Sequence, residues 1–231
     1  MSTPALSGTI DGLFSGKVSE LPSKRGTSAI SKKAVIGRQK IDEFGLLKDE
    51  QADLENHGGL DKAIHHYPAD HYAKWIAEGE ILTGTIPAAF GENISTLGLT
   101  ELTLCIGDKL RLGGAVVQIS QGRQPCWKVS EYTQNKKMAY LFQKTSRTGW
   151  YYRVLDGGDV NRGDHATLIE RTQPDWSVAR VTSARLSRKV SQADAEVLAC
   201  LPELAEDWRV AFARMASGDR EEDTSKRLGG S

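Results

Sequence analysis

The chain contains 231 residues, and its 30 lysines and arginines are balanced by 30 aspartates and glutamates. Proteins that bind nucleic acids or membrane surfaces usually carry a basic excess, so a net charge of zero disfavours both classes of partner. No apolar run approaches the roughly 20 residues that span a bilayer, and residues 1–7 lack the basic start and apolar core of a signal peptide.

The first 172 residues have the pattern of a mainly β, barrel-like domain, because short apolar runs alternate with glycine-containing turns. The predicted strands cover residues 8–14, 28–35, 63–67, 102–106, 109–112, 115–120 and 150–155. Gly113-Gly114 makes residues 109–120 a hairpin, and residues 160–169 repeat the Gly-Asp-then-apolar pattern of 106–112. Helices interrupt these strands between Pro68 and Gly79 and twice after Cys126.

Residues 173–218 change to a helical pattern. Ser191 to Asp194 resembles a capping box that opens a short helix ending at Leu201. A second helix follows from Pro202, with one apolar face and a stop at Gly218; the face consists of Leu204, Trp208, Ala211, Phe212 and Met215. We therefore predict a β domain over 1–172, a helical segment over 173–218 and a disordered tail over 219–231.

Three cysteines, Cys105, Cys126 and Cys200, are scattered along the chain without a CxxC pair, which indicates a reducing cytoplasm and no disulfide framework. Cys126 stands out because it follows a strand and a polar turn and lies near Arg123 and Lys128. Such an electropositive setting favours the thiolate, the form that acts as a nucleophile or a metal ligand. The alternative is a small apolar residue packed at a strand end, and this stretch by itself favours that alternative.

Four of the five histidines, His57, His65, His66 and His71, lie within fifteen residues. A zinc site is conceivable, but no pair has the spacing of ligands on one helix face, and neighbours on a strand point to opposite sides. The pattern therefore favours ordinary polar histidines.

Seven short stretches, taken together and in order, resemble the MOSC family, whose domain also forms the C-terminal part of molybdenum cofactor sulfurases. Their spacing is similar to that of its stand-alone bacterial YiiM-type branch, in which a three-helix segment follows the MOSC domain. The stretches are Ser28–Lys32, Asp49–Asp53, His57–Ala63, Phe90–Asn93, Gly107-Asp108, Gln118–Ser120 and Arg123–Cys126.

The resemblance implies a β-barrel with flanking helices and a molybdenum–pyranopterin cofactor whose metal is ligated by Cys126. It implies reduction of N-hydroxylated compounds such as hydroxylamino-purines, and its family-level description includes pyridoxal phosphate binding. Two other functions stay open: a sulfur carrier or transferase with a Cys126 persulfide, and a non-catalytic cofactor carrier. Metal analysis and turnover assays separate the three.

The residue types agree with a cofactor site. Arg123 and Lys32 can bind the phosphate of the cofactor. Backbone at Gly58, Gly59 and Gly91 can approach a flat pterin edge, and Asn93 offers both a donor and an acceptor.

The predicted catalytic group is Cys126, His57 and Lys32, with His57 supplying a proton. The chain has neither the four spaced cysteines of an iron–sulfur cluster nor a GxGxxG dinucleotide motif. Electrons would therefore come from a separate flavin or iron–sulfur protein.

Overall fold

A computed structural model describes residues 6–21, 23–53 and 58–229 of the chain. Thirteen strands form a barrel and two small sheets: β1 (Ser7–Ser15), β2 (Ser19–Glu20), β3 (Thr27–Ser28), β4 (Lys33–Ala34), β5 (Gln39–Asp42), β6 (Gly45–Leu46), β7 (Ile64–Pro68), β8 (Ile94–Leu97), β9 (Lys109–Leu112), β10 (Ala115–Gly122), β11 (Trp150–Asp156), β12 (Gly158–Val160) and β13 (His165–Glu170). The helices are a short 3-10 turn η1 (Leu60–Lys62), α1 (Asp70–Ala77), α2 (Trp127–Tyr132), α3 (Met138–Thr145), α4 (Val178–Ser187), α5 (Gln192–Ala199), α6 (Glu206–Ala216) and α7 (Ser225–Gly229).

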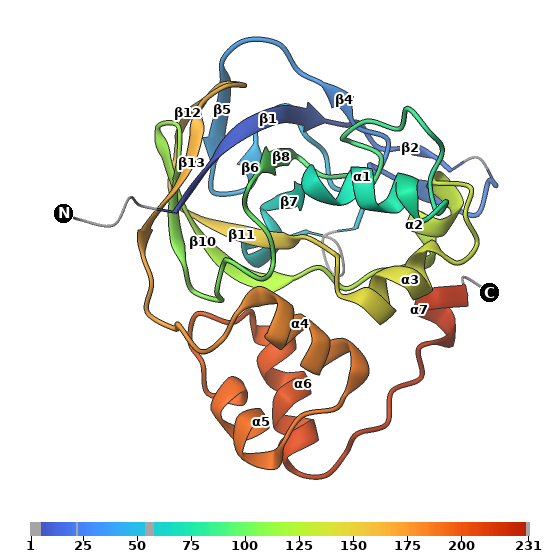
Figure 1. Ribbon diagram of the computed structural model, residues 1–231, viewed down its shortest axis with the longest axis vertical. Helices are drawn as coiled ribbons and strands as arrows, with labels where there is room; N and C mark the ends of the chain where they lie inside the picture. The colour runs from blue at the N-terminus through green and yellow to red at the C-terminus, as the bar shows by residue number, and fades with distance from the viewer. Residues whose placement is uncertain (1–5, 22, 54–57, 230–231) are drawn as a thin grey trace.

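The main sheet closes on itself to form a seven-stranded barrel. Its strand order is β13-β9-β10-β11-β7-β8-β1, and β1 pairs with β13 to close the ring, while β4 extends from β1. All neighbours in the ring are antiparallel except β7 and β8, which are joined by α1 and run parallel. Figure 1 shows the barrel above α4, α5 and α6, with α1 to α3 along its side. The predicted mainly β fold with flanking helices is confirmed.

One hydrophobic core is shared by the barrel interior and the helical segment. Leu110 and Ile119 of the barrel belong to the same buried cluster as Trp208, Phe212 and Met215 of α6. The backbone N–H of Ala205 also donates to the carbonyl of Ser120, at 2.9 Å. Burying each of these large side chains contributes about 1.5–3 kcal/mol, so the helical segment is part of what stabilises β10.

A second core is mostly aromatic and lies beneath α1, α2 and α3. Tyr67 of β7 stacks on Phe142 of α3, with ring centroids 5.7 Å apart, and Trp75 of α1 also stacks on Phe142, with centroids 5.8 Å apart. The indole N–H of Trp75 donates to the Tyr67 hydroxyl at 2.7 Å, so the polar tips of these rings are paired inside the core. This core fixes the helices that follow Cys126.

Two predicted strands are wrong. Residues 28–35 are divided between β3 and β4, because a tight turn places the N–H of Lys32 on the carbonyl of Ile30 at 2.9 Å. Residues 102–106 form turns with a single bridge from Cys105 to Ser177. There the Asp108 carboxylate accepts from the Cys105 N–H at 2.8 Å, in place of the carbonyl of a neighbouring strand.

The helical predictions agree closely with the structure, with three differences. Ser191 caps α5 by accepting from the Asp194 N–H at 3.0 Å, as the capping box predicts. The next helix begins at Glu206 rather than Pro202, and α4 was not predicted as a separate helix. Residues 219–229, expected to be disordered, form an extended stretch and α7, because charged side chains in this stretch find partners on α4 and on the loop before α2.

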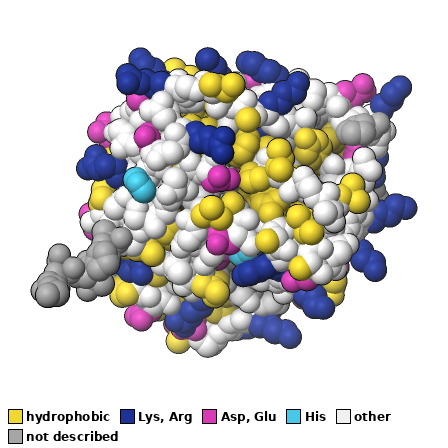
Figure 2. Space-filling model, turned by 45° about the horizontal axis from the view of Figure 1, so that its top comes forward, with side chains coloured by type: hydrophobic (Ala, Val, Ile, Leu, Met, Phe, Trp, Pro, Cys, Tyr) yellow, Lys and Arg dark blue, Asp and Glu magenta, His cyan; other side chains and the backbone are white. Residues whose placement is uncertain are grey.

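The surface has no strong single-sign field on the face drawn in Figure 2. Basic side chains are spread around its margin with acidic ones among them, and hydrophobic side chains gather toward the centre. Among the described residues, no helix combines the length and the apolar character needed to cross a bilayer.

Candidate functional site

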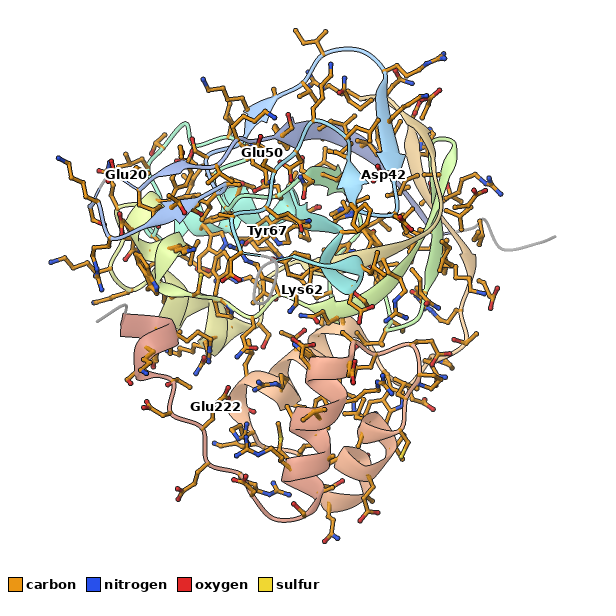
Figure 3. All side chains as sticks on the ribbon, turned by 180° about the vertical axis from the view of Figure 1, so that it is seen from behind. Glu20, Asp42, Glu50, Lys62, Tyr67 and Glu222 are labelled. Atoms are coloured by element: carbon orange, nitrogen blue, oxygen red, sulfur yellow. The ribbon has the colours of Figure 1, made fainter. Side chains whose placement is uncertain are left out.

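A pocket lies where the starts of β7 and β11 meet three segments, which contain residues 28–32, 49–53 and 123–128. Its lining includes five of the predicted site residues: Lys32, Gly91, Asn93, Arg123 and Cys126. Figure 3 shows this side of the molecule, with Glu50 on one side of the region and Lys62 on the other. The tertiary structure thus brings together segments that are almost a hundred positions apart.

Of the other predicted residues, Gly58 and Gly59 are described and are not among the residues that line the pocket. Gly58 and Gly59 lie before η1, where the Gly59 N–H donates to the side-chain oxygen of Gln51 at 3.3 Å. Gln51 itself lines the pocket, so Gly59 contacts the lining through this hydrogen bond. His57 lies outside the described residues.

Lys32 is held in the pocket wall by Asp49. The ammonium donates to both carboxylate oxygens, and the two side chains are only 7 and 8 % exposed. Burial lowers the pKa of Lys32 from its ordinary value, although the charge of Asp49 opposes this shift. Asp49 also accepts from the backbone N–H of Gly16 at 2.7 Å, so one carboxylate fixes both the lysine and the end of β1.

Asn93 stabilises the wall rather than offering a free amide to a ligand. Its oxygen accepts from the His65 N–H at 3.0 Å, and its nitrogen donates to Asp49 at 2.8 Å and to the Phe14 carbonyl at 3.3 Å. Gly91 has a positive φ of 75°, and a Cβ there would lie 2.7 Å from the Ile30 side chain. Its small size therefore serves close packing against the loop before Lys32.

Cys126 stands at the entry to α2, directly after the loop that leaves β10. Gly122, the last residue of β10, packs so tightly under α4 that a Cβ would overlap the Thr182 hydroxyl. The Arg123 N–H then donates to the Gly149 carbonyl at 3.1 Å, which ties the loop to β11. Cys126 is buried, with 9 % of its surface exposed, and faces the pocket.

Positive charge gathers at the Cys126 end of the pocket. Arg123 donates to the Phe90 carbonyl at 2.5 Å, and Lys128 donates to the Thr27 carbonyl at 3.1 Å. Because carbonyls are uncharged, these contacts orient both cations without neutralising them. The setting fits the electropositive surroundings that the sequence predicts for Cys126.

The neighbouring histidines of β7 face opposite sides, as predicted. His65 lines the pocket, whereas His66 points into the barrel and bonds the Tyr152 hydroxyl at 2.9 Å and the Thr96 hydroxyl at 2.8 Å. Burial lowers the pKa of His65 well below its ordinary value, and the charge of Arg123 adds to the shift. His65 is therefore neutral at pH 7 and can donate or accept a hydrogen bond without carrying charge.

Asp49, Lys62, His65 and Tyr151 are among the pocket residues that were not predicted from the sequence as site residues. Asp49 belongs to a stretch that carries the family resemblance, but only the fold shows that it pairs with Lys32. Lys62 binds Asp207 of α6 at 3.0 Å, so the helical segment reaches the pocket rim. Within the described part of the chain, no group of three or more His, Cys, Asp and Glu side chains could hold a metal ion.

The family model of the MOSC domain matches residues 53–167, which include Cys126, Arg123 and Asn93 but not Lys32 or Asp49. Protein YiiM of Escherichia coli is 34% identical over 219 residues, which cover 94% of this chain and 97% of that protein. Its crystal structure superposes with a TM-score of 0.78 and 30% identity, covering 96% of this chain and 98% of the other. The similarity therefore extends over the barrel and the helical segment together.

Two further relatives each match less of this chain. Protein YflK of Bacillus subtilis is 42% identical over 173 residues, 72% of this chain and 74% of that protein. A reductase of Gibberella moniliformis is 36% identical over 167 residues, 71% of this chain but only 30% of that protein. In the reductase, the matching part is therefore joined to much additional chain.

Proposed function

The chain belongs to the MOSC-domain family, as a YiiM-type member, and on that premise we propose that it is a molybdenum-cofactor-dependent oxidoreductase that reduces N-hydroxylated compounds to amines. The observation that carries the proposal is the position of Cys126, whose thiol faces the pocket beside Arg123 and Lys128. The family is associated with the molybdenum cofactor, and one relative is named a reductase.

The side chains of the pocket fit such a cofactor. Cys126 provides a soft sulfur ligand, the donor type that suits molybdenum better than carboxylates do. Arg123 and Lys128 supply charge-assisted donors for a phosphate, and their described contacts to carbonyls leave the positive charges available. Asn93 would act indirectly, since both ends of its amide are engaged within the wall.

The reaction R–NHOH + 2e⁻ + 2H⁺ → R–NH₂ + H₂O breaks the N–O bond. When bound, the molybdenum cofactor supplies the two-electron redox chemistry. The chain supplies protons and orientation: the Lys32 ammonium holds a proton at Nζ, and burial lowers the pKa of this group, which makes the proton easier to release. Neutral His65 can hydrogen-bond a substrate in the pocket, and His57 remains the second proton donor of the proposal.

Substitution of Cys126 by Ala tests the proposal, with Cys200→Ala as a matched control because Cys200 is exposed on the helical segment. We expect Cys126→Ala to unfold at the same temperature as the wild type, to lose bound molybdenum and to lose reduction of a hydroxylamino-purine by reduced viologen. Full metal content and full activity in Cys126→Ala would contradict the proposal. Cyanide-labile sulfur on Cys126 in a metal-free protein would favour the sulfur carrier instead.

Electrons would come from a separate flavin or iron–sulfur protein. The three cysteines are far apart in sequence, and one is assigned to the metal. We expect cofactor-loaded protein to turn over with reduced viologen but not with NADH as the sole reductant. Steady multi-turnover oxidation of NADH by the homogeneous protein and a hydroxylamino substrate would contradict this part of the proposal.

A further inference from the structure

The stretch from 219 to 229 crosses from the helical segment to the loop that carries Cys126. It leaves α6 after Gly218, where a positive φ of 93° turns the chain, and it ends in α7. Figure 1 shows α7 beside α2 and α3, far from α6. The stretch therefore spans two parts of the molecule that α6 itself does not join.

Glu222 anchors the middle of this stretch, and Figure 3 places it on the extended part below α7. Its carboxylate accepts from Arg185 at 2.9 Å and Arg188 at 3.3 Å, both on the last turns of α4 or just after it. It also accepts from the Gln124 side chain at 3.4 Å. Burial raises the pKa of Glu222, but the hydrogen bond from Arg185 and the charges of Arg185, Arg227 and Arg188 together outweigh it, so this pKa lies below its ordinary value.

Arg227 of α7 makes the second attachment. One guanidinium nitrogen donates to the carbonyl of Pro125 at 2.7 Å, and the other donates to the side-chain oxygen of Gln143 on α3 at 2.8 Å. Pro125 has no N–H, so its carbonyl is the only backbone group through which a partner can bind this residue. The partially buried Arg227 therefore connects the residue directly before Cys126 to a helix of the aromatic core.

We propose that residues 219–229 form a strap that positions Cys126, with Arg227 as the positioning residue. The strap lies outside the barrel and binds Gln124 and Pro125, the two loop residues that directly precede Cys126. Cys126 is 9 % exposed and lines the pocket, so the position of this loop sets how readily a reagent reaches the thiol. The proposal goes beyond the redox function and holds whichever chemistry Cys126 performs.

The test is the rate at which N-ethylmaleimide alkylates each cysteine of the metal-free protein at one fixed pH, followed by peptide mass spectrometry. Arg227→Gln removes both contacts, and Arg227→Lys keeps one donor. Lys226→Gln is the matched control, because it removes the same charge from an exposed neighbour on α7. Buried Cys105 is the internal reference for opening of the whole domain.

We expect Arg227→Gln to raise the alkylation rate of Cys126 about tenfold, as the loss of a charge-assisted hydrogen bond predicts, and to leave Cys105 unchanged. Arg227→Lys should raise the rate less than Arg227→Gln does, because one donor remains. Glu222→Gln removes the charge at the other attachment and should also raise the rate less.

An alkylation rate of Cys126 in Arg227→Gln within twofold of that in Lys226→Gln would overturn the proposal. A parallel rise at Cys105 would also overturn it, since the strap would then act on overall stability. Neither outcome depends on bound molybdenum, so failure here is distinct from failure of the proposed reductase.

Discussion

Lys32 and Cys126 face the same pocket, but the contacts that hold them come from different parts of the chain. We call the side of the pocket that carries Lys32 the Lys32 wall, and the side that carries Cys126 the Cys126 wall. On the Lys32 wall the contacting residues are closer in sequence: Asp49 is 17 positions from Lys32, and Asn93 is 44 positions from Asp49. On the Cys126 wall, Gln124 and Pro125 are held by residues 98 and 102 positions away. The barrel domain therefore forms the Lys32 wall by itself, whereas the Cys126 wall is completed by the helical segment and the strap.

The largest expected effect on stability comes from breaking the Lys32 wall with Asp49→Asn. This leaves a buried ammonium without its counter-ion, so we expect a loss of about 3–5 kcal/mol in the free energy of unfolding, measured with urea. Glu50→Gln is the matched control, because Glu50 pairs with Lys17 on the surface, with side chains 41 and 72 % exposed. The control should change stability by less than about 1 kcal/mol. Equal effects of the two substitutions would show that the buried pair does not hold this wall.

On the Cys126 wall, Arg123→Ala should change ligand retention. Losing a charge-assisted donor to the cofactor phosphate should weaken cofactor binding about tenfold to hundredfold. The measurement is molybdenum retained after dialysis at moderate salt, with Lys33→Ala as the control because Lys33 is an exposed cation beside the pocket lysine. Lys128→Ala should act in the same direction, because Lys128 is the second proposed donor to the phosphate. Retention equal to that of the control in both variants would place the anion site elsewhere.

The pH dependence of stability tests the burial of His66 in the barrel interior. Burial lowers the pKa of His66 from 6.5 to about 3. Below pH 6.5 the unfolded chain therefore binds a proton that the folded protein does not, and stability falls as the pH falls toward 3. His66 alone should cost about 2 kcal/mol by pH 5. His66→Gln should reduce the loss between pH 7 and pH 5 by that amount relative to the wild type. A pH dependence in His66→Gln identical to that of the wild type would show that buried His66 is not the source of the loss.

The smallest effect belongs to Cys200, which lies after α5, away from both walls. Its side chain is exposed, so Cys200→Ser should change the free energy of unfolding by no more than about 0.5 kcal/mol and leave metal content unchanged. Cys105→Ser should cost more stability, because Cys105 is buried beside Pro174, but should also spare the metal. Loss of metal from either variant with retention in Cys126→Ala would show that the ligand assignment is wrong.

Local patterns predicted most of the elements because local chemistry decides them. The hairpin at Gly113-Gly114, the capped start of α5 and the helix after Pro68 depend on neighbours within a few residues. The two wrong strands, 28–35 and 102–106, have strand-like composition, but a turn at Lys32 and the side chain of Asp108 replace ladder hydrogen bonds. Both replacement contacts are local, spanning two and three residues, but apolar composition does not indicate that a turn or a carboxylate will take the backbone N–H.

The amino-acid sequence by itself determined the barrel-and-helix composition, the family resemblance, and the selection of Cys126, Arg123 and Lys32 as pocket residues. Only the tertiary structure decided that Asp49 pairs with Lys32, that Asn93 is used within the wall, and that His65 rather than His66 faces the pocket. It also placed residues 219–229 against the Cys126 loop, although their charged composition is typical of a disordered tail. The physical reason is that burial and ion pairing depend on which distant surfaces meet, and closure of the barrel and docking of α4 create those surfaces.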